Sequence, residues 1–201
     1  MVAPLVALAA LLLAAPGSFD LETLAATLRG APAWRARFVQ RYVPAGLETG
    51  TTERGTLLLA RPLRLRFEYA GEAPRVFAVD GAVARMVDVA AGTCDAVPLD
   101  RGRWTRLPLA AILDPGAARD AFEAEAQGDG LRLRPRQPTA DVQEIRLSGT
   151  PGAPPSVLVV LDPGGNRNEF RFSHWEKLAD PGPEPFQPHL PGAPPCPAVE
   201  E

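Results

Sequence analysis

The sequence predicts a mainly β protein with a few short helices, built as an open or half barrel of antiparallel strands. Most of the chain alternates apolar and polar residues with a period of two, between turn sequences such as Asp80-Gly81. Only two internal segments have helical character. The 201 residues, 46% of them apolar and 22% charged, also fit one globular domain. An apolar face on such a sheet must be covered by other elements.

The N-terminal segment predicts export from the cytoplasm. Residues 2–15 form an almost unbroken apolar run, and the first charged side chain is Asp20. A membrane span needs about twenty apolar residues, so this run suits a secretory signal, with small residues favouring cleavage before Ser18. Because no basic residue precedes the run, a buried helix is the alternative. We expect a signal peptide over residues 1–17.

The next elements are a helix and a meander of strands. Residues 20–28 place Leu21, Leu24 and Leu28 at helical spacing, with an acidic residue at the start. The period then changes to two, which predicts a sheet with one apolar face and one solvated, arginine-rich face. The expected strands cover residues 34–42, 56–60, 63–69, 75–79 and 82–89.

The second half continues the pattern after an apolar interruption. Residues 107–113 are too apolar for a loop and too short for a core helix, so we expect a short, loosely held helix that ends at Asp114-Pro115-Gly116. From residue 179 the chain holds eight prolines and no periodicity, which predicts an extended tail. The expected strands cover residues 122–126, 131–134, 142–148, 156–161 and 169–175.

The sequence contains no motif for catalysis, nucleotide binding or metal binding. His174 and His189 have no Cys or His partner at ligand spacing, and Glu123 and Glu125 are best explained as a solvated strand edge. With 21 basic and 24 acidic residues and no basic block, nucleic acid is an unlikely partner. We therefore expect a protein that is not an enzyme and needs no cofactor. A closed core and a cavity for an apolar ligand both remain open interpretations.

The two cysteines, Cys94 and Cys196, lie a whole domain apart, and Cys196 falls in the proline-rich tail. In an oxidising compartment a disulfide that ties the tail to the domain is one possibility. The residues alone do not decide between this pairing and two separate thiols.

The order of signals in the first half resembles a known family. The segments concerned are Trp34-Arg35-Ala36-Arg37-Phe38-Val39-Gln40, the strand pair from Gly55 to Tyr69 with Arg61-Pro62 between its halves, and Val79-Asp80-Gly81. This order resembles the LolA family of periplasmic lipoprotein carriers. The resemblance covers residues 18–190 and is most specific over residues 34–81.

The resemblance implies an unclosed antiparallel barrel whose concave apolar side holds acyl chains under a lid of helices and loops. In the family, the arginine of the Arg-Pro motif binds lid carbonyls and keeps the empty carrier closed, which points to Arg61; an exposed strand-end arginine is the alternative. Leu109, Ile112 and Leu113 would belong to the lid. The residues expected to line the cavity, or else to form an ordinary core, are Trp34, Phe38, Leu57, Leu59, Leu65 and Phe67.

The implied function is that of a monomeric periplasmic carrier. It would receive lipoproteins from an inner-membrane ABC exporter, bind their acyl chains, and deliver them to an outer-membrane acceptor. A carrier of another lipid or glycolipid, and a lipid-sensing regulatory domain, are the alternatives. The sequence departs from the family over residues 82–88, which lack the usual aromatic pair, and in the tail over residues 191–201 that carries Cys196.

Overall fold

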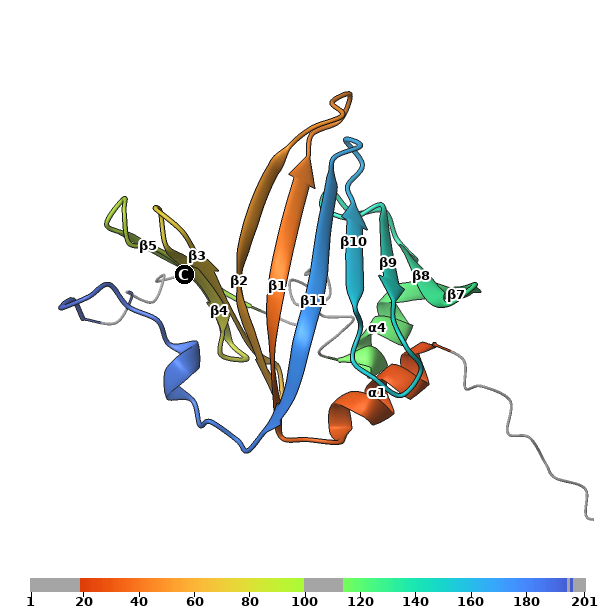
Figure 1. The fold of residues 1–201 in the computed structure, drawn as a ribbon, viewed down its shortest axis with the longest axis horizontal. Helices are drawn as coiled ribbons and strands as arrows, with labels where there is room; N and C mark the ends of the chain where they lie inside the picture. Colours follow the sequence, from red (N-terminus) through yellow and green to blue (C-terminus); the bar gives the residue numbers. More distant parts are fainter. Residues whose placement is uncertain (1–18, 100–113, 195, 197–201) are drawn as a thin grey trace, which may run out of the picture.

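The computed structural model describes residues 19–99, 114–194 and 196, which form one curved antiparallel sheet with two helices and a 3-10 turn (Figure 1). The helices are α1 (Leu21–Arg29) and α4 (Pro115–Ala121), and the 3-10 turn is η1 (Glu184–Phe186). The strands are β1 (Ala33–Val43), β2 (Thr51–Ala60), β3 (Arg64–Ala70), β4 (Arg75–Val79), β5 (Val83–Asp88), β6 (Thr93–Pro98), β7 (Phe122–Gln127), β8 (Gly130–Pro135), β9 (Glu144–Ser148), β10 (Val157–Leu161) and β11 (Arg167–Leu178).

The eleven strands follow the order β6-β5-β4-β3-β2-β1-β11-β10-β9-β8-β7. Strands β1 to β6 therefore follow one another from the centre of the sheet to one edge. Strands β7 to β11 follow one another from the other edge back to the centre, where β11 pairs with β1. Strands β6 and β7 form the two edges and do not pair with each other, so the barrel is not closed. The predicted fold class, a mainly β half barrel, is confirmed.

Helix α1 forms where its apolar spacing predicts it. Asp20 is the N-cap, and its carboxylate accepts a hydrogen bond of 2.8 Å from the backbone N–H of Thr23. Leu21, Leu24 and Leu28 are buried in the same apolar cluster as the inward-facing residues of the sheet. The helix therefore covers part of the apolar face.

The segment at residues 114–116 begins helix α4, which the sequence analysis did not expect. The carboxylate of Asp114 accepts a hydrogen bond of 2.9 Å from the backbone N–H of Ala117, and Pro115 occupies the first turn of α4. Aspartate at an N-cap followed by proline is a favoured helix start. The short helix expected at residues 107–113 lies outside the described residues.

Two strands differ from the sequence expectation. Strand β2 begins at Thr51 rather than residue 56, because its polar first half pairs with the long β1. Strand β6 was not expected at all; it pairs only with β5, and its residues Thr93–Pro98 lack a clear apolar alternation. Sequence periodicity detects the buried half of a sheet better than its exposed edges.

The outer face of β3 is not solvated as expected, because the C-terminal segment, residues 179–194 and 196, packs across it. Arg64 donates hydrogen bonds to the carbonyl of Gly182 (2.7 Å) and to the carboxylate of Asp180 (3.0 Å), and Arg66 donates to the carbonyl of Pro185 (3.0 Å). Phe186 is fully buried against Ala33 and Ala60 on the outer side of β1 and β2. The tail is thus a packed part of the domain.

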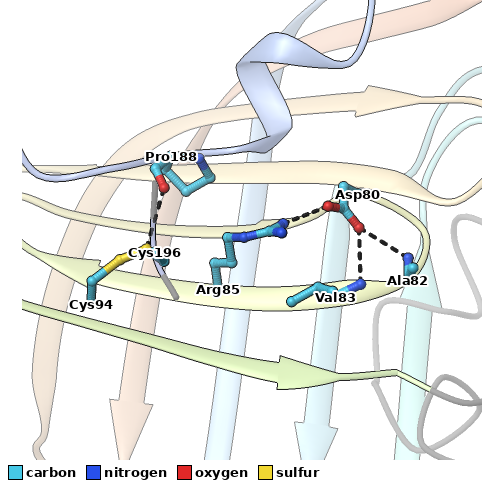
Figure 2. Close-up of polar contacts among 7 residues, drawn as sticks. All are labelled: Asp80, Ala82, Val83, Arg85, Cys94, Pro188 and Cys196. Atoms are coloured by element: carbon cyan, nitrogen blue, oxygen red, sulfur yellow. Dashed lines mark hydrogen bonds and ion pairs between the residues drawn. A yellow bond between two sulfur atoms is a disulfide. The ribbon is translucent and has the colours of Figure 1, made fainter. Parts of the chain in front are cut away.

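A disulfide joins the end of this C-terminal segment to β6. Cys94 of β6 bonds to Cys196, and the disulfide sulfur of Cys196 lies 3.4 Å from the carbonyl oxygen of Pro188 (Figure 2). Around the bridge, Val87 and Ala96 are buried in a small apolar cluster on the outer face of β5 and β6. The sequence left open a disulfide or two separate thiols, and the structure has the disulfide.

The nearby Asp80-Gly81 turn closes the β4–β5 hairpin as predicted. The Asp80 carboxylate accepts hydrogen bonds from the backbone N–H groups of Ala82 (3.0 Å) and Val83 (2.9 Å), and it forms an ion pair of 2.5 Å with Arg85 (Figure 2). Gly81 has φ +99°, a conformation that favours glycine. The turn is fixed by both its backbone and its side-chain contacts.

Candidate functional site

The inner face of the sheet brings together the six apolar residues that the sequence singled out. They come from three adjacent strands: Trp34 and Phe38 from β1, Leu57 and Leu59 from β2, and Leu65 and Phe67 from β3. Each is between 0% and 6% exposed, and all six belong to one buried cluster. We call these six residues the apolar floor.

Strand register explains why the floor is continuous. Trp34 pairs with Leu59, and Leu59 pairs with Leu65 on the next strand. Directly paired residues of antiparallel strands point to the same face, with Cβ atoms about 5 Å apart. Leu57 and Phe67 form the next such pair.

Gly55 makes room for the Phe38 ring of the floor. It pairs with Phe38, and a Cβ atom at this position would lie 2.9 Å from the Phe38 ring and 1.9 Å from the carbonyl oxygen of Glu68. A larger residue would therefore push against both the ring and the neighbouring strand. The glycine of the Gly-Thr-Leu segment has a packing role at the site.

The floor continues onto β11 through residues that the sequence analysis did not assign to the site. Phe170 lies 5.5 Å from Phe67 and 6.1 Å from Phe38, measured between ring centroids. Phe172 stacks on Phe170 at 6.1 Å. Their alternation along β11 is the signal that places both rings on the inner face.

Trp175 joins the same face through a bulge. The pairing of β1 with β11 shifts between Arg35 and Arg37, and His174 has φ +54°. This extra residue turns Trp175 toward Phe172, at a ring distance of 5.6 Å, and toward Trp34, at 6.3 Å. A strict period of two would have pointed Trp175 outward.

The inner face becomes polar at the end away from α1. Glu53 forms an ion pair with Arg75, whose guanidinium lies 5.2 Å from the ring centre of Tyr69. Burial raises the pKa of Tyr69 to about 12, and the Glu53 carboxylate adds to this rise. The amide of Gln40 donates a hydrogen bond of 2.9 Å to Asn168 at the same end. The apolar surface is thus bounded by hydrogen-bonding groups.

Two tryptophans fix neighbouring segments to the sheet. The indole N–H of Trp34 donates to the carbonyl of Leu28 in α1 at 3.1 Å, and the indole N–H of Trp175 donates to the carbonyl of Pro155 at 3.0 Å. Lys177 lies over the Trp34 ring, 5.5 Å from its centre. Each buried indole therefore has a hydrogen-bond partner.

A pocket of about 270 Å³ opens at the α1 end of the floor. Ala25 and Leu28 of α1, Trp34 and Leu59 of the floor, and Asp114 and Gly116 at the start of α4 contribute to its walls.

Arg61 also lines this pocket and is exposed. Its backbone N–H donates to the carbonyl of Pro32 at 3.2 Å, and its own carbonyl accepts from Arg64. Within the described ranges its guanidinium makes no hydrogen bond. Leu109, Ile112 and Leu113, the residues expected in the lid, lie outside the described residues.

Nothing among the described side chains forms a cluster of three or more metal-ligating residues. In the same part of the chain, no helix is long and apolar enough to cross a membrane.

The fold places the protein in the class of half barrels with a helix over the apolar inner face. Sequence comparison then gives its family. The model of the family described as outer membrane lipoprotein carrier protein LolA matches residues 29–189. The chain belongs to the LolA family. The predicted resemblance is confirmed, and the family is one of carriers rather than enzymes.

Individual relatives are distant in sequence. An outer-membrane lipoprotein carrier protein from Xanthomonas axonopodis pv. citri (strain 306) is 27% identical over 164 residues, covering 79% of this chain and 77% of that protein. A LolA superfamily protein from Nitrosomonas europaea has a TM-score of 0.48 and 9% identity, covering 84% of this chain and 98% of the other. The MucA/MucB complex of Pseudomonas aeruginosa has a TM-score of 0.47 and 16% identity, and the match covers 84% of this chain and 59% of the other.

Proposed function

We propose that the protein is a periplasmic carrier that binds the acyl chains of lipoproteins on its inner face and moves them from the inner to the outer membrane. Membership of the LolA family supports this function. The apolar run at residues 2–15 supports export through a cleaved signal peptide. The exporter would be an inner-membrane ABC transporter, and the acceptor an outer-membrane protein.

The observation that carries the proposal is the unbroken apolar surface of the inner face. The floor, Phe170, Phe172 and Trp175 form a chain of ring and aliphatic contacts across β3, β2, β1 and β11. Acyl chains need an extended apolar surface, because each buried methylene contributes about 0.8 kcal/mol. The polar border at Glu53, Arg75 and Tyr69 suits the boundary between an acyl chain and its head group.

Arg61 is proposed to hold the empty carrier closed. Its position at the mouth of the α1-end pocket supports this role. A guanidinium has five N–H donors, and lid carbonyls would supply acceptors for them in the closed state. Removing these bonds would favour the open carrier and raise the apparent affinity for cargo.

Cargo identification tests the proposed function. The protein is purified from periplasmic extract without detergent, and the bound material is analysed by mass spectrometry. Acyl chains attached to polypeptide are expected. Free phospholipid or glycolipid alone would contradict lipoprotein transport and favour a carrier of another lipid.

The Arg61→Leu variant tests the closing role. Loss of two charge-assisted hydrogen bonds, at about 1.5 to 3 kcal/mol each, would change the opening equilibrium by tenfold or more. Transfer of a bound lipoprotein to acceptor membranes should therefore slow, compared with wild type at equal loading. The exposed Arg119→Leu variant on α4 is the matched control. Equal transfer by Arg61→Leu and wild type would show that Arg61 is an ordinary surface residue.

A further inference from the structure

The outer face of the central strands carries a group of arginines that the proposed cargo site does not use. Val39 of β1 pairs with Arg54 of β2 on one side and with Arg171 of β11 on the other. Arg37 and Arg41 lie two residues before and after Val39, so they point to the same face. With Arg167, which pairs with Val43, we call this set the arginine face: Arg37, Arg41, Arg54, Arg167 and Arg171.

The arginine face has a large uncompensated positive charge. Among the described residues of β1, β2 and β11 around these arginines, the acidic residue on this face is Glu169, which is 8% exposed and forms ion pairs with both Arg167 and Arg171. At the border of the patch, Glu68 of β3 pairs in register with Thr56 of β2 and forms an ion pair with Arg66. Arg37 and Arg54 are exposed and form no ion pair within the described ranges. Five arginines against one glutamate leave an excess of four positive charges, in a chain whose formal net charge is -3.

Neighbouring parts of the outer face are different. Arg64 and Arg66 are occupied by carbonyls of the C-terminal segment. Arg35 forms an ion pair of 2.7 Å with Glu176, which neutralises it. In Figure 1 the C-terminal segment leaves the end of β11 and runs toward β3, β4 and β5, away from the middle of β1 and β11. The arginine face is therefore a patch with an excess of positive charge. Arg167 and Arg171 share Glu169, and Arg41 donates a hydrogen bond to the carbonyl of Glu48.

Exposed apolar side chains adjoin this patch at the β1–β2 hairpin. Leu47 in the turn is 60% exposed, and Val39 in the middle of the patch is 44% exposed. The backbone N–H of Ala45 donates to the side chain of Asn166 at 3.0 Å, which ties this turn to the β10–β11 turn. Figure 1 shows the two turns at the same end of the sheet.

We propose that the protein binds anionic phospholipid membranes through the arginine face, with Leu47 at the boundary between head groups and acyl chains. Guanidinium groups bind phosphate oxygens through paired hydrogen bonds. Positive side chains bordered by exposed aliphatic residues are typical of surfaces that lie in a membrane interface. An acidic protein would also match the charges, and the vesicle experiment below distinguishes it from a membrane.

This contact is independent of the cargo site, because it uses the opposite face of the same strands. The inner face would stay available for cargo while the outer face rests on the membrane. Failure of one proposal therefore leaves the other intact. An apolar dye that reports on the inner face separates the two, because its binding should not change in arginine-face variants.

The test is flotation with vesicles of the protein purified from periplasmic extract, which on the proposed function lacks the apolar residues 1–17. One set is pure phosphatidylcholine, and the other contains about one third phosphatidylglycerol. The Arg37→Gln/Arg54→Gln double variant removes two exposed charges that have no ion-pair partner in the described structure. The Arg119→Gln/Arg136→Gln variant removes the same charge from exposed positions outside the arginine face. All variants share the same N-terminal segment, so differences between them report on the arginines.

We expect binding to the anionic vesicles only, lowered roughly thirty-fold in Arg37→Gln/Arg54→Gln and nearly unchanged in the control. Leu47→Ser should weaken binding further when added to the double variant. Raising the salt from about 50 mM to about 500 mM should release the wild type, because ions screen exposed charges.

Three results would overturn the proposal. They are equal binding by Arg37→Gln/Arg54→Gln and its control, equal binding to neutral vesicles, and no binding of the wild type to anionic vesicles at low salt. The last result would point to an acidic protein as the partner of this surface. Circular dichroism on each variant verifies that it is folded before the comparison is made.

Discussion

Replacing both cysteines by serine should lower stability by releasing the C-terminal segment from the edge of the sheet. The disulfide closes a loop with a sequence separation of 102 residues between Cys94 and Cys196. In the chain-entropy treatment, a loop of about 100 residues gives about 4.7 kcal/mol, and removal of a native disulfide typically costs about 2 to 5 kcal/mol. The bridge therefore makes a substantial contribution to a domain of ordinary stability.

The structure places the expected loss below this upper value. The C-terminal segment keeps two other attachments without the bridge: the buried Phe186, and the hydrogen bonds from Arg64 to Gly182 and Asp180. The part after Pro188 loses its covalent anchor and keeps the packing of Leu190 against the cluster of Val87 and Ala96. We expect a loss of about 2 to 4 kcal/mol, which lowers the midpoint of thermal unfolding by roughly 4 to 16 °C for a domain of this size.

Differential scanning calorimetry measures the effect on Cys94→Ser/Cys196→Ser. Wild type in reducing agent should unfold at the same lowered temperature, because it lacks the same covalent bond. Wild type in oxidising buffer is the control and should show no free thiol. A folded double variant with an unchanged unfolding temperature would refute the reasoning, since it would show that the tail is held without the bridge.

Three further predictions concern separate parts of the molecule. Phe186→Ala should cost about 3 to 5 kcal/mol in chemical unfolding, because the ring is fully buried; a cost no larger than that of the exposed His189→Ala would refute it. Leu65→Glu, on the floor, should weaken binding of an apolar dye in the folded protein, because an unpaired charge there is costly to bury; unchanged affinity would show that this face does not bind the dye.

The third concerns pH. Burial alone would raise the pKa of Asp80, but hydrogen bonds from Arg85 and from two backbone N–H groups lower it overall. A lowered pKa in the folded state gives stability that is present above the ordinary value of 3.8 and is lost as the pH falls below it. Asp80→Asn should therefore lower stability near pH 7 and flatten the acid side of the stability curve; parallel curves for both proteins would contradict this.

The sequence predicts those features that depend on neighbours along the chain. Alternation placed Trp34 and Phe38 on one face of a strand, and the same rule placed Leu57 and Leu59 opposite them. The Asp80-Gly81 turn and the Asp20 cap likewise depend on residues within three positions of each other. Local spacing was sufficient for these elements, whereas the unclosed barrel was what the resemblance to the LolA family implied.

Features that depend on distant contacts escaped prediction. The bulge at His174 carries no sequence signal, so Trp175 could not be placed with Trp34. Arg64 and Arg66 have the same alternation as Arg37, yet they differ from it in having carbonyl partners more than a hundred residues away. Alternation assigns a residue to a face, but it cannot say which parts of that face another segment covers.

The apolar floor is covered by other side chains in the structure, and this affects how a carrier would release its cargo. Floor residues are at most 6% exposed, and Leu24 of α1, which is 1% exposed, belongs to the same cluster. Burying about a dozen methylenes would contribute on the order of 10 kcal/mol, but incoming acyl chains would first have to displace side chains that already cover the floor. The free energy of this opening is subtracted from the affinity. Contacts that stabilise the empty protein therefore lower its affinity for cargo. A carrier that must release an acyl chain to an acceptor needs this lower affinity.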